Sequence, residues 1–347
     1  MADGTPIRTA IIGYGLSGRI FHAPFIAANP SFSLEAISTG DPARRAQAAR
    51  DHPGAEILGS PDDLLAGSFD LVVLGSPAHV HREQGLAALG GGAALVVDKP
   101  FAASVAEAEE LIAAADSASL PLMVFQNRRW DGDFLTVRKL VDSGALGEVH
   151  RFESAFERWS PALGQRWQDT TTTSQGAGIV FDLGSHLVDQ ALQLFGPATL
   201  TAAELSILRP GGVSADEAFL SLLHDNGTRS HLTMSRFATR SGPRFRTLGT
   251  KAGYTVHGLD GQEPALVAGA RPTDPDFGLT PEDAWGTLGI DGSDPPPDMV
   301  PTERGDYAAF YVGVAATLRD GAPPPVDPAD ALAALRIIAR AHEITGI

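Results

Sequence analysis

A glycine-rich segment near the start of the chain constrains the fold more than any other feature. Residues Ile7 to His22 read IRTAIIGYGLSGRIFH, an apolar run that stops at the first of three closely spaced glycines and leads into a helix-compatible segment. The pattern is typical of a strand, a tight turn and a helix. Gly13 permits the turn, Gly15 admits a pyrophosphate, and Gly18 lets the helix pack against the strand. Such turns also occur in sheets that bind no ligand, so the segments that follow must decide.

The composition of the chain narrows the classes of protein to which it can belong. Its 347 residues are enough for two domains, each with its own core. The formal net charge of -16 argues against a surface that binds nucleic acid or anionic membranes, since both require basic patches. The chain has no cysteine, which excludes disulfides, thiolate metal sites and cysteine nucleophiles. With neither a signal peptide nor an apolar run of ~20 residues, we expect a soluble cytoplasmic protein with no membrane partner.

Short apolar strands alternate with helices as far as residue 126. Asp41 and Pro42 start one helix as cap and first residue, and Ser104 with Glu107 forms a capping box for another. This alternation is typical of a doubly wound parallel sheet, the Rossmann arrangement. We therefore expect an α/β dinucleotide-binding domain over residues 1–126. Its strands after the first are predicted at 32–38, from 70, from 94 and at 121–126.

From Gly147 the pattern changes, because strands now follow one another. This predicts an α+β domain over residues 127–347 with an open, mostly antiparallel sheet, and Asp225-Asn226-Gly227 marks a hairpin. The predicted strands are 148–159, 199–208, 217–225, 228–237, 244–250 and 252–258, and two helices close the chain at 306–319 and 328–345.

Two features of the second domain suggest contacts with other molecules. A sheet covered by helices on one face leaves the other face bare, and we expect association between copies of the chain to cover that face. The apolar residues expected there are Phe219, Leu222, Leu232 and Phe237. The Pro-, Gly- and Asp-rich stretch from Gly258 to Gly305 is too long for an ordinary connection, so it is either a functional loop or a partner contact.

The end of the second strand predicts which dinucleotide binds. NAD-selective sites place an acid there for the ribose hydroxyls, but this chain has Ser38-Thr39-Gly40. Ser38, Thr39 and Arg44 or Arg45 could hold a 2'-phosphate instead, which favours NADP and leaves NAD possible. The alternative is that both arginines lie on a solvated helix face.

Three further spots could carry chemistry. Lys99 ends a parallel strand, where ligands of such sheets bind, although strand-end lysines are often only solvated. The turn from Ser76 through Pro77 to His81 also follows a strand, and His81 either reaches a cofactor or caps a helix. Asp182 and His186 are four apart and share a helix face, either as a general base with its orienting carboxylate or as a structural pair.

Together these motifs resemble the glucose-fructose oxidoreductase, inositol dehydrogenase and MocA-like family, whose members carry the Gly loop, an acidic residue followed by Lys-Pro, and D-x-x-x-H in that order. The segments GYGLSGRIFHAP, QNRRWDGDF, RWSPALGQRW and GLDGQEPAL are most similar to its NADP-preferring scyllo-inositol dehydrogenase branch. The resemblance implies catalytic roles for Lys99, Asp182 and His186, no metal, and a homodimer or homotetramer. The cofactor residues are then expected to be Gly13, Gly15, Leu16, Ser17, Gly18, Ser38, Thr39, Arg44, Ser76, Pro77, His81 and Lys99, and the substrate residues Arg128, Trp159, Arg166, Trp167, Asp182 and His186.

The chain departs from the family in one turn, where Ala78 stands in place of the usual asparagine. The resemblance implies an NAD(P)-dependent dehydrogenase that oxidises a secondary hydroxyl of a cyclic polyol or sugar, or the same fold acting on another carbonyl compound. Residues such as Arg128 could equally lie at a domain interface. The competing class is a cofactor-sensing regulator without turnover, which would have no need of Lys99, Asp182 and His186 together.

Overall fold

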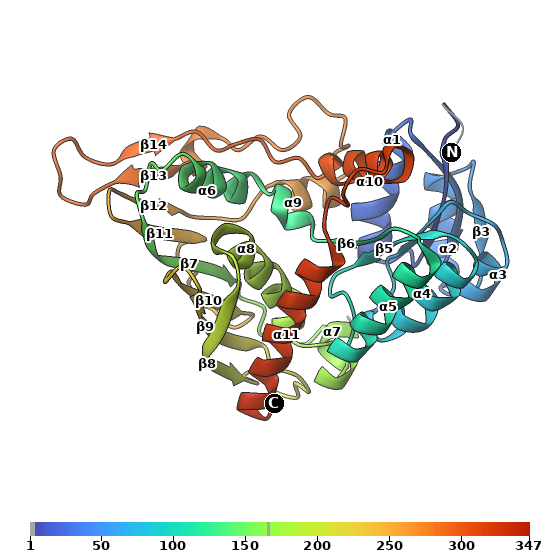
Figure 1. Cartoon of the computed structure of the whole chain (residues 1–347), viewed down its shortest axis with the longest axis horizontal. Coiled ribbons are helices and arrows are strands. Elements are labelled where there is room, and N and C mark those ends of the chain that lie inside the picture. Colours follow the sequence, from blue (N-terminus) through green and yellow to red (C-terminus); the bar gives the residue numbers. More distant parts are fainter. Residues whose placement is uncertain (1–3, 165–166) are drawn as a thin grey trace. The chain divides into compact units, whose positions relative to one another are not determined.

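The computed structural model describes residues 4–164 and 167–347 (Figure 1). The chain forms two units: the first comprises Met1–Gln126, Glu263–Phe277 and Tyr307–Leu332, and the second comprises Asn127–Gln262, Gly278–Asp306 and Ala333–Ile347. The first boundary coincides with the sequence-based division at residue 126. Two later segments also belong to the first unit.

The first unit is built on a six-stranded parallel sheet in the order β3-β2-β1-β4-β5-β6. This is the strand order of a dinucleotide-binding Rossmann fold, so the predicted fold class of this part is confirmed. The short edge strand β3 was not predicted. The strands are β1 (Ile7–Ile12), β2 (Phe32–Ser38), β3 (Glu56–Leu58), β4 (Leu71–Leu74), β5 (Ala94–Asp98) and β6 (Leu122–Phe125).

Two helices of the first unit begin at the caps that the sequence predicts. The Asp41 carboxylate accepts hydrogen bonds from the N–H groups of Ala43 (2.8 Å) and Arg44 (2.9 Å), and the Ser104 hydroxyl accepts one from Glu107 N–H (3.3 Å). The helix after the Gly loop starts as a π-helix, η1 (Ser17–His22), and continues as α1 (Ala23–Ala28). The others are α2 (Pro42–Asp51), α3 (Pro61–Leu65), η2 (Ala78–Val80), α4 (His81–Gly90), α5 (Val105–Ala118) and α10 (Ala308–Asp320).

The second unit contains an eight-stranded sheet in the order β14-β13-β12-β11-β7-β10-β9-β8 (Figure 1). Only the β7–β10 pair is parallel in this described sheet, so the predicted mostly antiparallel arrangement is confirmed. The predicted hairpin joins β9 to β10, with Gly227 at a φ of 89°. The strands are β7 (Val149–Glu157), β8 (Ala198–Ser206), β9 (Glu217–His224), β10 (Arg229–Ser235), β11 (Phe245–Gly249), β12 (Gly253–Val256), β13 (Gly286–Gly289) and β14 (Asp298–Val300).

Helices α6 (Gly132–Asp142) and α8 (Ser185–Phe195) pack on the central strands of this sheet. Side chains such as Phe152, Phe156 and Met234 fill the layer between them and are fully buried. The other helical segments of the second unit are η3 (Asn127–Trp130), α7 (Trp167–Thr170), η4 (Thr173–Gln175), η5 (Val180–Gly184) and η6 (Glu282–Ala284). Helix α9 (Gln262–Val267) belongs to the first unit from Glu263 on. The boundary between the units falls within the last helix, α11 (Pro328–Thr345).

One sequence-based expectation for the second unit is corrected. Leu222 and Leu232 lie on the helix-covered face and are fully buried, because the alternation along β9 and β10 turns them inward. Phe219 and Phe237 keep partial exposure. The stretch Gly258–Gly305 contains α9, β13 and β14, which were not predicted, and its role as a functional loop or a partner contact stays a prediction.

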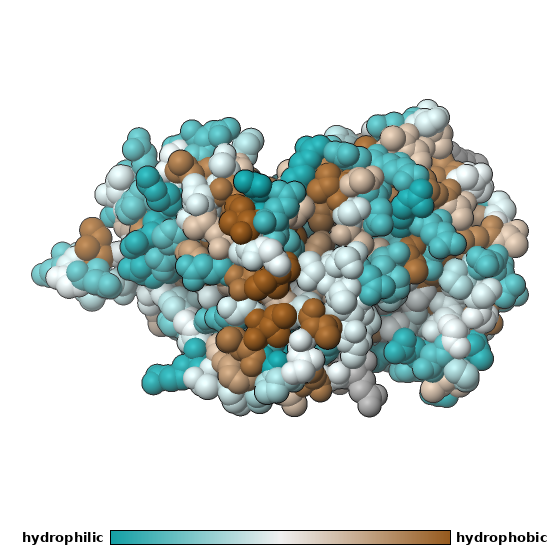
Figure 2. Space-filling view, turned by 90° about the horizontal axis from the view of Figure 1, so that it is seen from below, coloured by the Kyte–Doolittle hydropathy of each residue, from teal (hydrophilic) through white to brown (hydrophobic). Residues whose placement is uncertain are grey.

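The described surface mixes hydrophobic and hydrophilic residues. Figure 2 shows hydrophobic residues gathered in several groups on the face that it displays. No helix in the described ranges combines the length and hydropathy needed to cross a membrane.

Candidate functional site

The predicted cofactor residues lie along one edge of the first unit's sheet. Gly13 follows β1, Ser38 ends β2, Ser76 follows β4, and Lys99 follows β5. All four strands are parallel, so their carboxyl ends share this edge, where ligands of open α/β sheets bind.

The three glycines of the loop have different surroundings. Gly13 has a φ of 96°, and a Cβ there would lie 2.7 Å from the carbonyl oxygen of Gly75. A Cβ on Gly18 would overlap the carbonyl oxygen of Gly13. In contrast, a Cβ on Gly15 would meet only the Arg44 guanidinium, at 3.8 Å, among the described atoms. Two glycines therefore permit close backbone packing, and Gly15 leaves open space beside a cation.

Hydroxyl groups beside this loop lack protein partners. The Oγ atoms of Ser17 and Ser38 are buried and have no hydrogen-bond partner among the residues that the structure describes. Of the other predicted cofactor residues nearby, Leu16 is exposed. The backbone of Thr39 is fixed by a hydrogen bond from its N–H to the carbonyl oxygen of Leu58 (3.1 Å). Buried hydroxyls are normally paired, so Ser17 and Ser38 have capacity to bind a ligand.

The two arginines after β2 have different environments. Arg45 Nη1 donates to the carbonyl oxygens of Thr39 (3.3 Å) and Gly40 (2.9 Å), which fixes the turn after β2. The Arg44 side chain is exposed and extends toward Gly15. Arg44 is therefore better placed than Arg45 to meet a phosphate.

The turn after β4 is held by a buried histidine. His81 is fully buried, and its Nδ1 and Nε2 lie 3.2 Å and 2.8 Å from the carbonyl oxygens of Phe101 and Ser76. Burial lowers the pKa of His81. The Ser76 hydroxyl donates to Gln84 Oε1 (2.6 Å), and Pro77 leads into η2. This geometry favours a positioning role for His81, while contact of Ser76, Pro77 and His81 with a cofactor stays a prediction.

Lys99 directly follows the buried strand β5. Its side chain is partly exposed, its N–H donates to Oδ1 of Asp98 (2.7 Å), and the Lys99-Pro100 peptide bond is cis. Lys99 therefore stands at the edge of the sheet that carries the Gly loop.

In the second unit, Asp182 and His186 lie where a π-helix passes into an α-helix. Asp182 is within η5, its N–H donates to the carbonyl oxygen of Gly178 (3.0 Å), and His186 is the second residue of α8. Both side chains are buried. Asp182 Oδ2 accepts a hydrogen bond from Nη2 of Arg236 in a buried ion pair. Irregular turns of this kind are frequent at functional sites.

Arg128 and Trp159, both predicted substrate residues, have contrasting exposure. Arg128 is buried, its Nη1 lies 3.1 Å from Oδ2 of Asp131, and its guanidinium covers the Phe156 ring at 4.9 Å. Trp159 is 52% exposed and packs on Phe237 with ring centroids 4.8 Å apart. The Trp159 surface is thus available to a ligand, whereas Arg128 is engaged within the unit.

Trp167, which begins α7, is partly exposed, and the predicted substrate residue Arg166 lies outside the described residues. The same short helix is tied to the sheet by a buried network. Arg209 donates to Asp169 (2.9 Å) and to Asp216 (2.9 Å). This network holds α7.

The structure thus gathers the predicted residues in two groups. Lys99 and the cofactor residues belong to the first unit, and Asp182, His186, Arg128, Trp159 and Trp167 belong to the second. No group of three or more side chains suited to a metal ion was found within residues 4–164 and 167–347.

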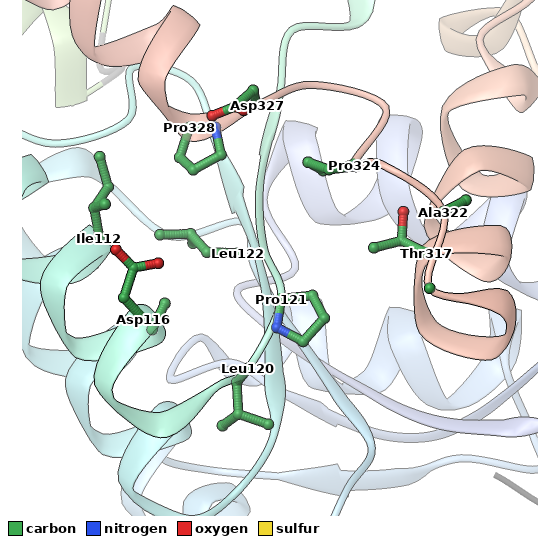
Figure 3. Close-up of a pocket in the computed structure, with 12 residues that line it drawn as sticks. Ile112, Asp116, Leu120, Pro121, Leu122, Thr317, Ala322, Pro324, Asp327 and Pro328 are labelled. Carbon is green, nitrogen blue, oxygen red and sulfur yellow. The ribbon is translucent and has the colours of Figure 1, made fainter.

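One cavity of about 370 Å³ lies in the first unit, away from the Gly-loop edge (Figure 3). Leu120, Pro121 and Leu122 line it at the amino end of β6, together with Asp116 of α5 and Thr317 of α10. Because the amino ends of parallel strands face away from the ligand edge, this cavity is not part of the predicted site.

Sequence reasoning missed Arg236. Ser230, Leu232 and Met234 are alternate buried positions of β10, so the alternation continued one step places residue 236 on the buried side. The sequence signal that could have identified Arg236 is a charged residue at a position where the alternation of β10 predicts a buried side chain. Its partner Asp182 is 54 residues away in the chain, and no local pattern identifies it.

Comparison with known proteins gives two family matches. Residues 7–126 match the family described as an oxidoreductase family with an NAD-binding Rossmann fold. Residues 134–255 match the GFO/IDH/MocA C-terminal domain.

Individual proteins are similar over nearly the whole chain. The scyllo-inositol 2-dehydrogenase (NADP(+)) IolW of Bacillus subtilis is 33% identical over 97% of this chain and 93% of its own. The uncharacterized oxidoreductase YdgJ of Escherichia coli is 36% identical over 96% of this chain and 94% of its own. The solved structure of the putative oxidoreductase yvaA of Bacillus subtilis superposes with a TM-score of 0.93 at 31% identity, covering 100% of this chain and 98% of the other.

Substitutions of the glycines should separate packing from ligand binding. Gly18→Ala should destabilise the fold by about 1–3 kcal/mol or more, because its Cβ meets backbone. Gly15→Ala should leave thermal unfolding near wild type and weaken dinucleotide binding, since its Cβ enters open space. Thermal melts and NADP titrations check both. Gly54→Ala, a control with nothing within 4 Å of the new Cβ, should change neither quantity. Equal NADP affinity in Gly15→Ala and wild type would contradict the assignment.

Proposed function

Because the chain belongs to the GFO/IDH/MocA oxidoreductase family, we propose that it transfers a hydride between NADP and a secondary hydroxyl or keto group of a cyclic polyol or sugar. The observation that carries the proposal is the open side of Gly15 beside the exposed Arg44, with no carboxylate at the end of β2. The name of the relative IolW, a scyllo-inositol dehydrogenase that uses NADP, supports the same substrate class.

The residues around the Gly loop fit a dinucleotide. The space at Gly15 suits a pyrophosphate next to backbone N–H groups, and the buried hydroxyls of Ser17 and Ser38 can donate to an anionic ligand. Thr39 and Arg44 would hold the 2'-phosphate. Bound NADP supplies the hydride acceptor at its nicotinamide ring.

Side chains of this protein accept and return the proton of the substrate hydroxyl. We propose that His186 takes the proton of the substrate hydroxyl while the carbon–oxygen bond becomes a carbonyl. The Lys99 ammonium stabilises the negative charge that develops on the oxygen, and Asp182 orients the histidine. In the reverse direction His186 returns the proton to the oxygen.

A substrate panel tests the proposed function. Inositols and common sugars are offered with NADP and with NAD, and the absorbance of the reduced cofactor is followed. We expect turnover of at least one cyclic polyol or sugar, faster with NADP. If the protein binds NADP but reduces it with no member of the panel, the proposed function is wrong.

His186→Ala and Lys99→Ala should each lower kcat by ~10²- to 10⁴-fold, the usual worth of a general acid or base. Affinity for NADP should change little in His186→Ala, because the histidine serves the proton and not the cofactor. Steady-state kinetics and cofactor titration check this. If either folded variant keeps near wild-type turnover, its role is wrong.

The cofactor preference should depend on two residues after β2. Thr39→Asp should shift kcat/KM toward NAD, because a carboxylate repels the 2'-phosphate. Arg44→Ala should weaken NADP use about tenfold to a hundredfold and barely affect NAD, as expected for a charge-assisted arginine–phosphate pair of roughly 1.5 to 3 kcal/mol. Arg50→Ala, an exposed arginine of the same helix, is the control. Unchanged discrimination in Arg44→Ala would mean that the phosphate is bound elsewhere.

We also propose that copies of the chain associate through the outer face of the second unit's sheet into a homodimer or homotetramer. Partly exposed apolar side chains on that face, Phe219 and Leu223, support this. Light scattering at micromolar concentration should give the mass of at least two chains, and Phe219→Asp should lower it. A wild-type protein with the mass of one chain would refute the proposal.

A further inference from the structure

Arg236 is a buried cation next to the predicted acid–base pair. Only 7% of its side chain is exposed, and its Nη2 donates to Oδ2 of Asp182, whose side chain is 8% exposed. A carboxylate taken out of water is strongly disfavoured unless a cation and hydrogen bonds accompany it, and otherwise takes up a proton. The buried Arg236 guanidinium therefore favours the charged form of Asp182.

The backbone of Arg236 is itself held on both sides. Its N–H donates to the carbonyl oxygen of Asp216 (2.9 Å), and its carbonyl oxygen accepts a hydrogen bond from Ser160 N–H (2.8 Å). Ser160 starts the 160–175 segment, and the carboxylate of Asp216 holds Arg209 (2.9 Å). The guanidinium thus extends from a backbone that is hydrogen-bonded on both sides.

Charged groups on neighbouring elements of the second unit have other partners. Asp189, one turn after His186 on α8, accepts a hydrogen bond from Nε of Arg129 on η3 (2.8 Å). Arg209 is paired with Asp216, and the ring of His342 on α11 stacks on the ring of Phe181. The ion pair of Arg236 with Asp182 is therefore separate from these pairs.

We propose that Arg236 is a positioning residue, which holds Asp182 ionised and oriented so that the proton of the substrate hydroxyl passes to the His186 ring and not to Asp182. This inference rests on the proposed function, since it concerns the same proton transfer. Arg236 touches neither substrate nor cofactor in this role and acts through Asp182.

Two substitutions separate charge from shape. Arg236→Met removes the charge and should lower kcat by about 10- to 100-fold, as losses of groups that orient a reacting residue do, with the KM for NADP unchanged. Arg236→Lys keeps the charge and should retain most of the kcat. Arg229→Met, at the exposed start of the same strand, is the matched control and should behave as wild type.

A second measurement needs no turnover. The titration of the His186 ring is followed by NMR, with His186→Gln assigning its signal. In Arg236→Met, Asp182 takes up a proton and no longer stabilises the imidazolium, so the midpoint should move to lower pH, and Arg236→Lys should restore it. If Arg236→Met does not fold, the double variant Asp182→Asn/Arg236→Met, which removes both charges, is compared with Asp182→Asn alone. The added Arg236→Met should then change kcat little.

The outcomes are distinct. A wild-type titration midpoint together with wild-type kcat in folded Arg236→Met would overturn the role of Arg236. So would a full additional loss of kcat on adding Arg236→Met to Asp182→Asn. If the wild type turns over no polyol or sugar, the proposed function fails, and the titration alone then decides whether Arg236 sets the charge around His186.

Discussion

The first unit depends on a contact between backbones that carry no side chains. Gly13, Gly18 and Gly75 come together where β1 ends, the first helix starts and β4 ends. Any Cβ on Gly13 or Gly18 would collide with a carbonyl oxygen, so the helix lies closer to the sheet than other residues allow. This closeness turns the N–H groups of the loop toward the ligand edge, along which the later turns with Ser76 and Lys99 also lie.

The second unit uses buried charge where the first uses close backbone packing. Arg129 donates to Asp189 (2.8 Å), Arg244 Nη2 to Gln190 Oε1 (2.9 Å), and Gln190 Nε2 to the carbonyl oxygen of Arg128 (2.9 Å). Two of these residues lie on α8, one turn after the predicted catalytic histidine. Such bonds are directional and have little slack in a packed interior, so they fix the rotation of α8 about its own axis.

Local patterns predicted most of the fold, because strand, turn and cap signals act between residues near in sequence. The Gly loop, the Asp41 cap and the Asp225–Gly227 hairpin are of this kind. The pairing of Asp182 with Arg236 was not predicted, since the two residues are 54 positions apart in the chain. Strands β13 and β14 were not predicted either, because runs of four and three residues carry too little alternation to be recognised. For the candidate site, the motifs predicted which positions to consider. The structure then showed that Arg44 and Trp159 are exposed, whereas Arg45 and Arg128 are engaged in contacts within their own units.

The first unit is completed by residues from near the end of the chain. Tyr311 of α10 lies 2.7 Å from Nδ1 of the buried His22, and Phe310 packs on Phe125 of β6 with ring centroids 4.8 Å apart. A fragment ending at residue 126 would therefore expose part of this core. During synthesis the amino-terminal sheet therefore stays incompletely covered until α10 has left the ribosome, and its apolar surface is exposed to aggregation for that time.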